Sequence, residues 1–341
     1  MSPELLAVIA VIAAAMVFDF TNGFHDAANA IATSVSTRAL TPGVALLVAA
    51  AGNFVGTHFG ANVAKTVGEG LVVLPPGLSS LGVVFAGVLG AIAWNLFTWY
   101  IGLPSSSSHA LFGGLVGATL LAVGGHVQWG NIVDKVIVPM VASPIVGFTL
   151  GAVIMVGVLW SIKLLARWAP AATQPRRLNR FFRYAQSASA AAMAVGHGMQ
   201  DAAKTMGIIV LALYVGGIQS SPTEIPWWVY YTSATVLALG TYAGGWRIIR
   251  TLGRRIIHLG PPEGFAAESV ASSVLYFTAS IGAPISTTQT ITSAIMGVGA
   301  TKRVSAVRWG VAGNIVAAWV LTFPGAGLIA CLAYLIVRPL F

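Results

Sequence analysis

Two aspartates lie inside long apolar stretches of the chain, each among small and polar neighbours. The segment Asn22-Gly-Phe-His-Asp26-Ala-Ala-Asn29 resembles His197-Gly-Met-Gln-Asp201-Ala-Ala-Lys204, with Asp26 aligned on Asp201. An acid at the centre of a bilayer costs about 2.5–3.5 kcal/mol on insertion scales. Both segments carry an acid at the same position despite this cost. We therefore expect both acids to belong to a buried binding site rather than to have a purely structural role.

A second pair of motifs is rich in hydroxyl groups. Gly102-Leu-Pro104-Ser-Ser-Ser-Ser108-His109 resembles Gly282-Ala-Pro284-Ile-Ser-Thr-Thr288-Gln289, and each motif ends one apolar stretch and begins another. Ser and Thr are preferred N-cap residues, so both motifs predict a helix that begins at membrane depth. The N–H groups, hydroxyls and positive dipole ends of two such helices would bind an anion. Single serines often link membrane helices, but mirrored runs after a proline favour binding hairpins.

Histidines and a lysine accompany these motifs. His25 directly precedes Asp26, where an imidazole that titrates near neutrality could relay protons, although a structural hydrogen-bonding role fits it equally well. Lys204 is the one basic side chain inside a predicted span. It either adds charge to an anion site or neutralises Asp201.

The composition identifies the elements that must position these groups. Hydrophobic residues make up 57% and charged residues 8% of the 341 residues, with a mean hydropathy of +0.84. A soluble globular domain carries roughly 25% charged residues. These values exclude a soluble enzyme, a disordered chain and a nucleic-acid binder, and they predict an all-α polytopic membrane protein. The only cysteine, Cys331, excludes an internal disulfide and a thiolate cluster; we expect no cofactor and no protein-bound metal.

The paired motifs keep their order along the chain, which indicates a tandem duplication. We divide the chain into a first repeat (1–160), a basic cytoplasmic linker (161–184) and a second repeat (185–341). Apolar stretches fall at 4–32, 43–63, 80–101, 104–123 and 136–160, then at 185–215, 226–246, 266–282, 284–300 and 306–336. An odd number in each half predicts that the halves are inserted upside down. We expect Gly23 and Gly198 to break the helices beside the acids, as in transporters built from inverted repeats.

The net charge of +9 follows from the distribution of Lys and Arg over the loops. Most of these residues gather on one side if the central linker is cytoplasmic, as the positive-inside rule requires, and both termini then lie outside. We interpret 5–18 as part of the mature first helix rather than a cleaved signal peptide. The basic segment 246–258 has apolar residues at helical spacing and predicts a short amphipathic helix on the cytoplasmic membrane surface, with a plain basic loop as the alternative.

The four motifs resemble the signatures of the inorganic phosphate transporter (PiT) family, in the family's order and over about residues 19–325. The resemblance implies a secondary active transporter, a symporter of inorganic phosphate, with two inverted repeats, broken helices and two hairpins whose tips meet at the substrate site. It also implies a multi-pass protein of the cell (plasma or inner) membrane that forms a homodimer in the lipid bilayer. The co-transported ion would be a proton or sodium, and a divalent metal could travel with the phosphate.

The resemblance carries over to particular positions. The substrate-binding residues would be Asp26, Asp201, Ser105, Ser106, Ser107, Ser108, Ser286, Thr287, Thr288, Gln289 and Lys204. The residues that couple transport to a cation or proton would be Asn22, His25, Asp26, Asn29, Gln200 and Asp201. Sodium-coupled members have Asn directly before both aspartates, where this chain has His25 and Gln200. The Phe-His-Asp form resembles the short, proton-coupled prokaryotic branch, although that branch usually has Asn at the position of Gln200.

Other functions remain open from the sequence. Sulfate is the nearest rival substrate, but only phosphate near neutrality carries protons that it can donate to the two acids. Sodium coupling is the main alternative to proton coupling, and a passive channel would be excluded by uphill uptake. An intramembrane serine hydrolase could use Ser105 and His109, which are spaced i,i+4, but the mirrored positions Ile285 and Gln289 hold no such pair.

Overall fold

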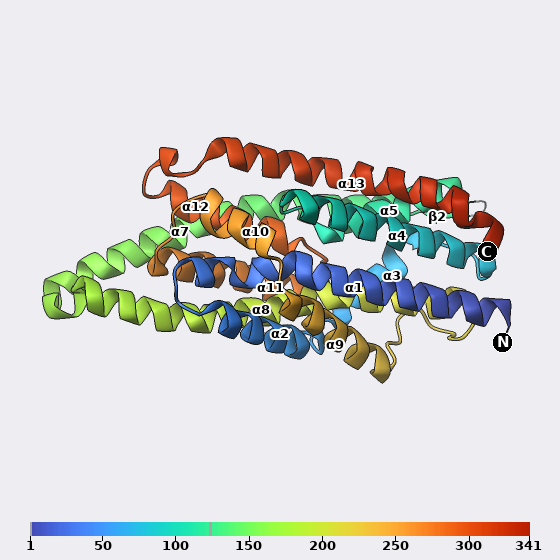
Figure 1. The fold of residues 1–341 in the computed structure, drawn as a ribbon, viewed down its shortest axis with the longest axis horizontal. Coiled ribbons are helices and arrows are strands. Elements are labelled where there is room, and N and C mark those ends of the chain that lie inside the picture. Colours follow the sequence, from blue (N-terminus) through green and yellow to red (C-terminus); the bar gives the residue numbers. More distant parts are fainter. Residues whose placement is uncertain (1, 123–124) are drawn as a thin grey trace.

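The computed structural model describes residues 2–122 and 125–341, and these residues form a bundle of helices (Figure 1). The α-helices are α1 (Pro3–Ser36), α2 (Pro42–Thr57), α3 (Ala61–Gly70), α4 (Leu78–Ile101), α5 (Ser107–Leu121), α6 (Trp129–Ile132), α7 (Val138–Trp168), α8 (Pro175–Val215), α9 (Trp227–Ala243), α10 (Trp246–Arg250), α11 (Pro261–Ser280), α12 (Thr287–Ala300) and α13 (Trp309–Val337). Two-residue strands β1 (Val72–Val73) and β2 (His126–Val127) pair antiparallel. Every predicted apolar stretch contains a helix, so the all-α prediction is confirmed.

Some of these helices are long and apolar enough to cross a bilayer. They are α1, α4, the continuous segment Trp129–Trp168 that includes α7, and the segment Trp309–Leu340 that includes α13. Helices α2 and α3, bent by 67° relative to each other, together would make a further span. By contrast α5 and α12 have 15 and 14 residues. At a rise of 1.5 Å per residue they are about 21–22 Å long, which is less than the roughly 30 Å of bilayer hydrocarbon.

The short helices belong to two hairpins, α4–α5 and α11–α12. Strand pairing of Val72 with Val127 brings the two ends of the first hairpin together, and an ion pair between Glu263 and Lys302 joins the two ends of the second. Both hairpins therefore return to the side from which they start. They are the two predicted hairpins, and they replace separate crossings by their four helices.

The tips of both hairpins have the same glycine conformation and the same type of N-cap. Gly102 and Gly282 each have φ 71°, the left-handed conformation that glycine adopts without steric cost. Ser106 and Ser286 are the N-caps of α5 and α12, and each Oγ accepts a hydrogen bond of 3.2 Å from the backbone N–H three residues on. The predicted helix starts are confirmed.

The predicted helix breaks beside the acids are wrong. Helices α1 and α8 run without interruption over 34 and 41 residues. Gly23 and Gly198 instead allow neighbouring backbones to approach, because a Cβ at Gly23 would lie 2.6 Å from the carbonyl oxygen of Leu237 in α9, and one at Gly198 would lie 2.7 Å from Cα of Asn53 in α2. The helix breaks fall between α2 and α3 and between α9 and α10.

The predicted amphipathic helix at 246–258 is helical over 246–255, formed by α10 and a π-helical turn at Thr251–Arg255. Its apolar residues do not lie on a membrane surface, because Ile248, Ile249, Leu252 and Ile256 are at most 6% exposed and belong to the protein core. That part of the prediction is wrong. Close packing against α1 covers the apolar face, which the helical spacing alone could not reveal.

The buried apolar residues form two clusters that leave the middle of the bundle to polar groups. Helix α1 contributes residues up to Phe18 to one cluster and residues from Ala28 onward to the other. Helix α8 likewise contributes Met193 to one cluster and Ala203 to the other. Both chain termini lie at the end of the molecule opposite the turn between α7 and α8 (Figure 1).

Candidate functional site

The hairpin tips meet α1 and α8 between the two apolar clusters. Every residue that the sequence assigned to substrate binding or coupling lies there and is at most 2% exposed. The structure therefore brings all of these residues to one buried region. Two helix N-termini, with their unsatisfied N–H groups and positive dipole ends, point into that region from α5 and α12.

Asp26 on α1 contacts both hairpins. Its Oδ2 accepts a 2.8 Å hydrogen bond from the Ser107 hydroxyl of α5, and its Oδ1 accepts a 3.4 Å bond from Thr288 of α12. His25 Nδ1 lies 2.6 Å from the same Oδ1, while His25 Nε2 lies 3.1 Å from Thr98 Oγ1. Nδ1 carries a proton whenever Asp26 is ionised, because an ionised carboxylate only accepts hydrogen bonds.

Asp201 on α8 has a different set of partners. Lys204 Nζ donates to its Oδ1 at 2.8 Å and also to the backbone carbonyl of Ile285 at 3.0 Å. Asn22 and Thr287 donate to Oδ2 at 3.4 Å each. Lys204 thus neutralises Asp201 and at the same time holds the tip of the second hairpin.

His197 gives Asp201 a second basic neighbour, with Nε2 at 3.1 Å from Oδ2. The other ring nitrogen faces Asn53 Oδ1 at 2.9 Å, and the Asn53 amide donates to Thr241, whose hydroxyl donates to the carbonyl of Leu237. This chain of donors leaves Asn53 Oδ1 as an acceptor, so Nδ1 carries a proton. His197 Nε2, which faces Asp201 Oδ2, has no hydrogen-bond partner among the residues that the structure describes.

Three other predicted residues hold the hairpins in place. Gln200 accepts from the N–H of Ile285 at 3.3 Å and donates to the carbonyl of Ala283 at 3.2 Å, so it binds the backbone of the second tip. Gln289 lies 3.3 Å from His109, one residue from each hairpin. Asn29 donates to Thr287 and Thr288 at 3.2 and 2.9 Å.

The arrangement does not support the hydrolase pair considered from the sequence. Ser105 Oγ contacts Thr98 at 2.8 Å and His25 at 3.4 Å, whereas His109 faces Gln289. Ser105 and His109 therefore do not form a nucleophile–base pair.

Two further buried acids, which the sequence did not single out, lie in the same helical bundle. Asp19 and Glu268 are both 0% exposed. Thr205 donates to Asp19 at 2.9 Å, and Glu268 accepts from Ser189 at 2.6 Å, from Gln186 at 3.3 Å and from Thr33. Each lies within an apolar stretch, and an acid in such a stretch is itself a signal of a buried polar site. Neither has an acidic counterpart in the other half, so a comparison of the two halves does not identify them.

One group of side chains could hold a cation. Asp26, His197 and Asp201 each offer one ligand atom, and these atoms all lie within 4.8 Å of one another. Carboxylate oxygen and imidazole nitrogen both ligate divalent metals. The sequence predicted no protein-bound metal and did not anticipate His197 as part of such a group.

Buried polar residues at the centre of an apolar helical bundle, reached by two hairpins, define a membrane transport protein. Within that class, the chain belongs to the phosphate transporter family: the sequence profile of that description matches residues 22–330. The resemblance to the PiT family is thereby confirmed.

Curated relatives cover nearly the whole chain. A "Probable low-affinity inorganic phosphate transporter" of Rhizobium meliloti (strain 1021) is 48% identical over 96% of this chain and 95% of the relative. A protein of the same description from Bacillus subtilis (strain 168) is 41% identical over 99% of both chains. One from Mycobacterium tuberculosis (strain ATCC 25618 / H37Rv) is 44% identical over 98% of this chain and 78% of its own length. The chain is accordingly not an enzyme.

A solved structure shares the fold. It is described as "The sodium-dependent phosphate transporter", with a TM-score of 0.86, 22% sequence identity, and coverage of 98% of this chain and 100% of the solved one. The all-α fold is therefore confirmed by an independent structure.

Proposed function

We propose that this protein is a secondary active symporter that takes up inorganic phosphate and binds it between Asp26, Asp201 and the two hairpin tips. The observation that carries the proposal is the placement of Thr287 and Thr288, adjacent residues of one tip that donate to one acid each. A phosphate that entered between them would replace these weak 3.4 Å contacts with its own. The names of the relatives, which describe phosphate transporters, support the substrate.

The chemistry of the site favours phosphate over sulfate. Hydroxyl and N–H donors at the tips serve either anion, but a substrate oxygen that replaces the Thr288 hydroxyl beside Asp26 has to donate to the carboxylate. Phosphate near neutrality carries a proton and can supply that donor, whereas sulfate leaves the carboxylate facing another acceptor. The mismatch is of the kind that polar sites reject strongly.

We propose coupling to protons. Each acid has a titratable imidazole beside it, His25 at 2.6 Å from Asp26 and His197 at 3.1 Å from Asp201. Histidine changes charge near neutral pH, so such pairs can take up a proton on one side of the membrane and release it on the other. A metal–phosphate complex as the cargo fits the same place, because Asp26, His197 and Asp201 could ligate its metal.

A specific observation keeps sodium coupling as the second candidate. The amide oxygens Asn22 Oδ1 and Asn29 Oδ1 are buried and have no hydrogen-bond partner among the residues that the structure describes. Oxygen is the ligand that hard cations prefer. The solved structure of the same fold is, by its title, sodium-dependent.

We also propose that residues 1–160 and 185–341 are inverted repeats joined by the linker 161–184. Exchanged contacts support this: Gly23 packs on the backbone of α9 and Gly198 on that of α2, while Gly56 in α2 packs on α8 and Gly240 in α9 packs on α1. The linker would be cytoplasmic and both termini outside, in a homodimer of the cell membrane.

Uptake of radiolabelled phosphate into proteoliposomes tests the substrate. We expect accumulation against a phosphate gradient, with unlabelled phosphate competing and an equal concentration of sulfate having little effect, since about 1–3 kcal/mol per unsatisfied polar group amounts to roughly a factor of 5 to 150 in affinity. Equal competition by sulfate would make the protein a general oxyanion carrier. Equilibration without accumulation would make it a channel.

A further inference from the structure

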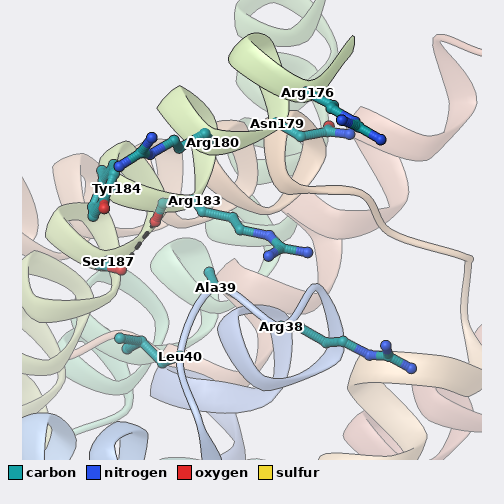
Figure 2. A pocket seen from close by; sticks show the side chains of 9 residues that line it. All are labelled: Arg38, Ala39, Leu40, Arg176, Asn179, Arg180, Arg183, Tyr184 and Ser187. Atoms are coloured by element: carbon teal, nitrogen blue, oxygen red, sulfur yellow. Dashed lines mark hydrogen bonds between the residues drawn. The ribbon is translucent and has the colours of Figure 1, made fainter.

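A cavity of about 710 Å³ lies between the end of α1 and the first turns of α8 (Figure 2). It is separate from the buried site, since none of the residues assigned to substrate binding or coupling lines it. Four of its lining residues are arginines, Arg38 from the segment after α1 and Arg176, Arg180 and Arg183 from α8. Asn179 and Ser187 add polar groups, and the lining contains no acidic residue.

The four arginines are exposed, and their guanidinium groups have no counter-ion among the residues that the structure describes. In the part of the chain that the structure describes, the ion pairs involve His25, His197, Lys204 and Lys302 but none of these arginines. Figure 2 shows Arg38, Arg176 and Arg183 extending toward the same side of the cavity. Each guanidinium offers five N–H donors in a planar fork that matches the oxygens of a phosphate group.

The backbone at Arg38 is a further sign that its side chain matters there. Arg38 has φ 60°, and it is the one residue other than glycine with a positive φ among the described residues. This left-handed conformation favours glycine and costs energy for a residue with a Cβ. Arginine at this position costs backbone stability and places a cation at the cavity.

We propose that this cavity binds a phosphate group. The alternative is that the arginines are solvated charges that only orient the protein under the positive-inside rule. That rule asks for basic residues in loops, not for four of them around one cavity without counter-ions. Guanidinium groups with an amide beside them, as Asn179 lies here, are a common arrangement for phosphate recognition.

The cavity adjoins a chain of polar contacts that follows α1 and α8 toward the buried site. Thr37, next to Arg38, donates to Gln186 at 2.7 Å, and Gln186 donates to Glu268 at 3.3 Å. Thr33, one turn nearer to Asp26 on α1, also donates to Glu268. The phosphate group could belong to inorganic phosphate held at this end of the protein or to the headgroup of an anionic phospholipid. The site does not depend on which ion drives transport.

A pair of double variants with the same change in charge tests the proposal. Arg38→Gln/Arg183→Gln removes two cavity arginines, whereas Arg167→Gln/Arg177→Gln removes two arginines of the same exposure class near the same end that do not line the cavity. The first arm titrates inorganic phosphate by calorimetry into detergent-purified protein that also carries Asp26→Asn and Asp201→Asn, so that the buried site does not contribute. The second arm uses native mass spectrometry to compare phosphatidylglycerol with phosphatidylcholine retained by otherwise wild-type protein.

We expect the cavity variant to lose at least about tenfold in affinity in one arm, since charge-assisted bidentate pairs are strong, and the control to change less than about twofold. A loss in the calorimetric arm identifies inorganic phosphate, and a loss only in the lipid arm identifies a headgroup. If the cavity variant matches the control in both arms, the arginines are solvated charges and the proposal is wrong. If the variants with both acids replaced do not fold, the calorimetric arm is run with both acids intact, and the cavity variant should then lose one of two phosphate-binding events.

Discussion

The two acids that match in sequence differ in their surroundings. Asp26 receives hydrogen bonds from both hairpins and from His25, whereas Asp201 is balanced by Lys204. A buried carboxylate beside an ammonium group stays ionised at lower cost than one surrounded by neutral donors. Asp26 is therefore the better candidate for exchanging a proton with the substrate, and Asp201 for holding its charge.

Replacement of either acid by its amide tests these roles. Asp26→Asn and Asp201→Asn keep the size of the side chain but remove its charge, and we expect each to abolish phosphate uptake while the protein still inserts and purifies. Asp134→Asn, at an exposed aspartate outside the site, is the control and should leave uptake unchanged. Near-normal uptake by Asp26→Asn or Asp201→Asn would remove that acid from the mechanism.

His25 allows a test of coupling at the level of one residue. Asparagine in its place retains a hydrogen bond to Asp26 but does not titrate, so His25→Asn should flatten or shift the pH dependence of uptake. His58→Asn changes an exposed histidine and serves as the control. An unchanged pH profile in His25→Asn would leave the proton to the acids or to His197.

The helices that carry the acids show what a sequence can and cannot reveal about an element. The sequence predicted helix starts at the two tips correctly, because proline followed by hydroxyl residues is a local signal. It placed the helix breaks at Gly23 and Gly198 wrongly. A missing Cβ permits either a break or a close approach of another backbone, and only the position of α9 and α2 decides between these.

Gly198→Ala tests the close approach. The added Cβ would overlap the backbone of Asn53, and overpacking of this kind costs about 1–3 kcal/mol. We expect a lower melting temperature in detergent and reduced uptake. Gly157→Ala is a matched control, because its Cβ would meet nothing within 4 Å, and it should be neutral or stabilising by about 0.5–1 kcal/mol. Equal melting temperatures for the two variants would contradict this account of the α2–α8 packing.

At the scale of the whole molecule, composition and mirrored motifs were enough to predict a helical membrane protein, its two hairpins and its family. Glu268, which has no acidic counterpart in the other half, was missed, and so was the contact between His197 and Asn53. The packing of Ile248 and Ile249 against the core was missed as well, since helical spacing does not say whether lipid or protein covers a face. These contacts join segments far apart in the chain, and a single sequence carries no direct record of them.

The proposed orientation can be checked by labelling. In a Cys331→Ser background, cysteines at Arg177 and Lys302 should react only with reagents on the cytoplasmic side, and a cysteine at Ser221 only from outside. The reason is the excess of Lys and Arg expected in cytoplasmic loops. Labelling of positions 177 and 221 from the same side would contradict the inverted repeats.

The central claim, a proton-driven phosphate symporter, is tested most directly by uptake into proteoliposomes under one imposed gradient at a time. We predict that an inward proton gradient drives accumulation of labelled phosphate in sodium-free buffer, that a protonophore abolishes it, and that Asp26→Asn liposomes show none. Accumulation that requires a sodium gradient and ignores the protonophore would contradict proton coupling. In that case the amide oxygens of Asn22 and Asn29, which have no hydrogen-bond partner among the described residues, would be assigned to a sodium site.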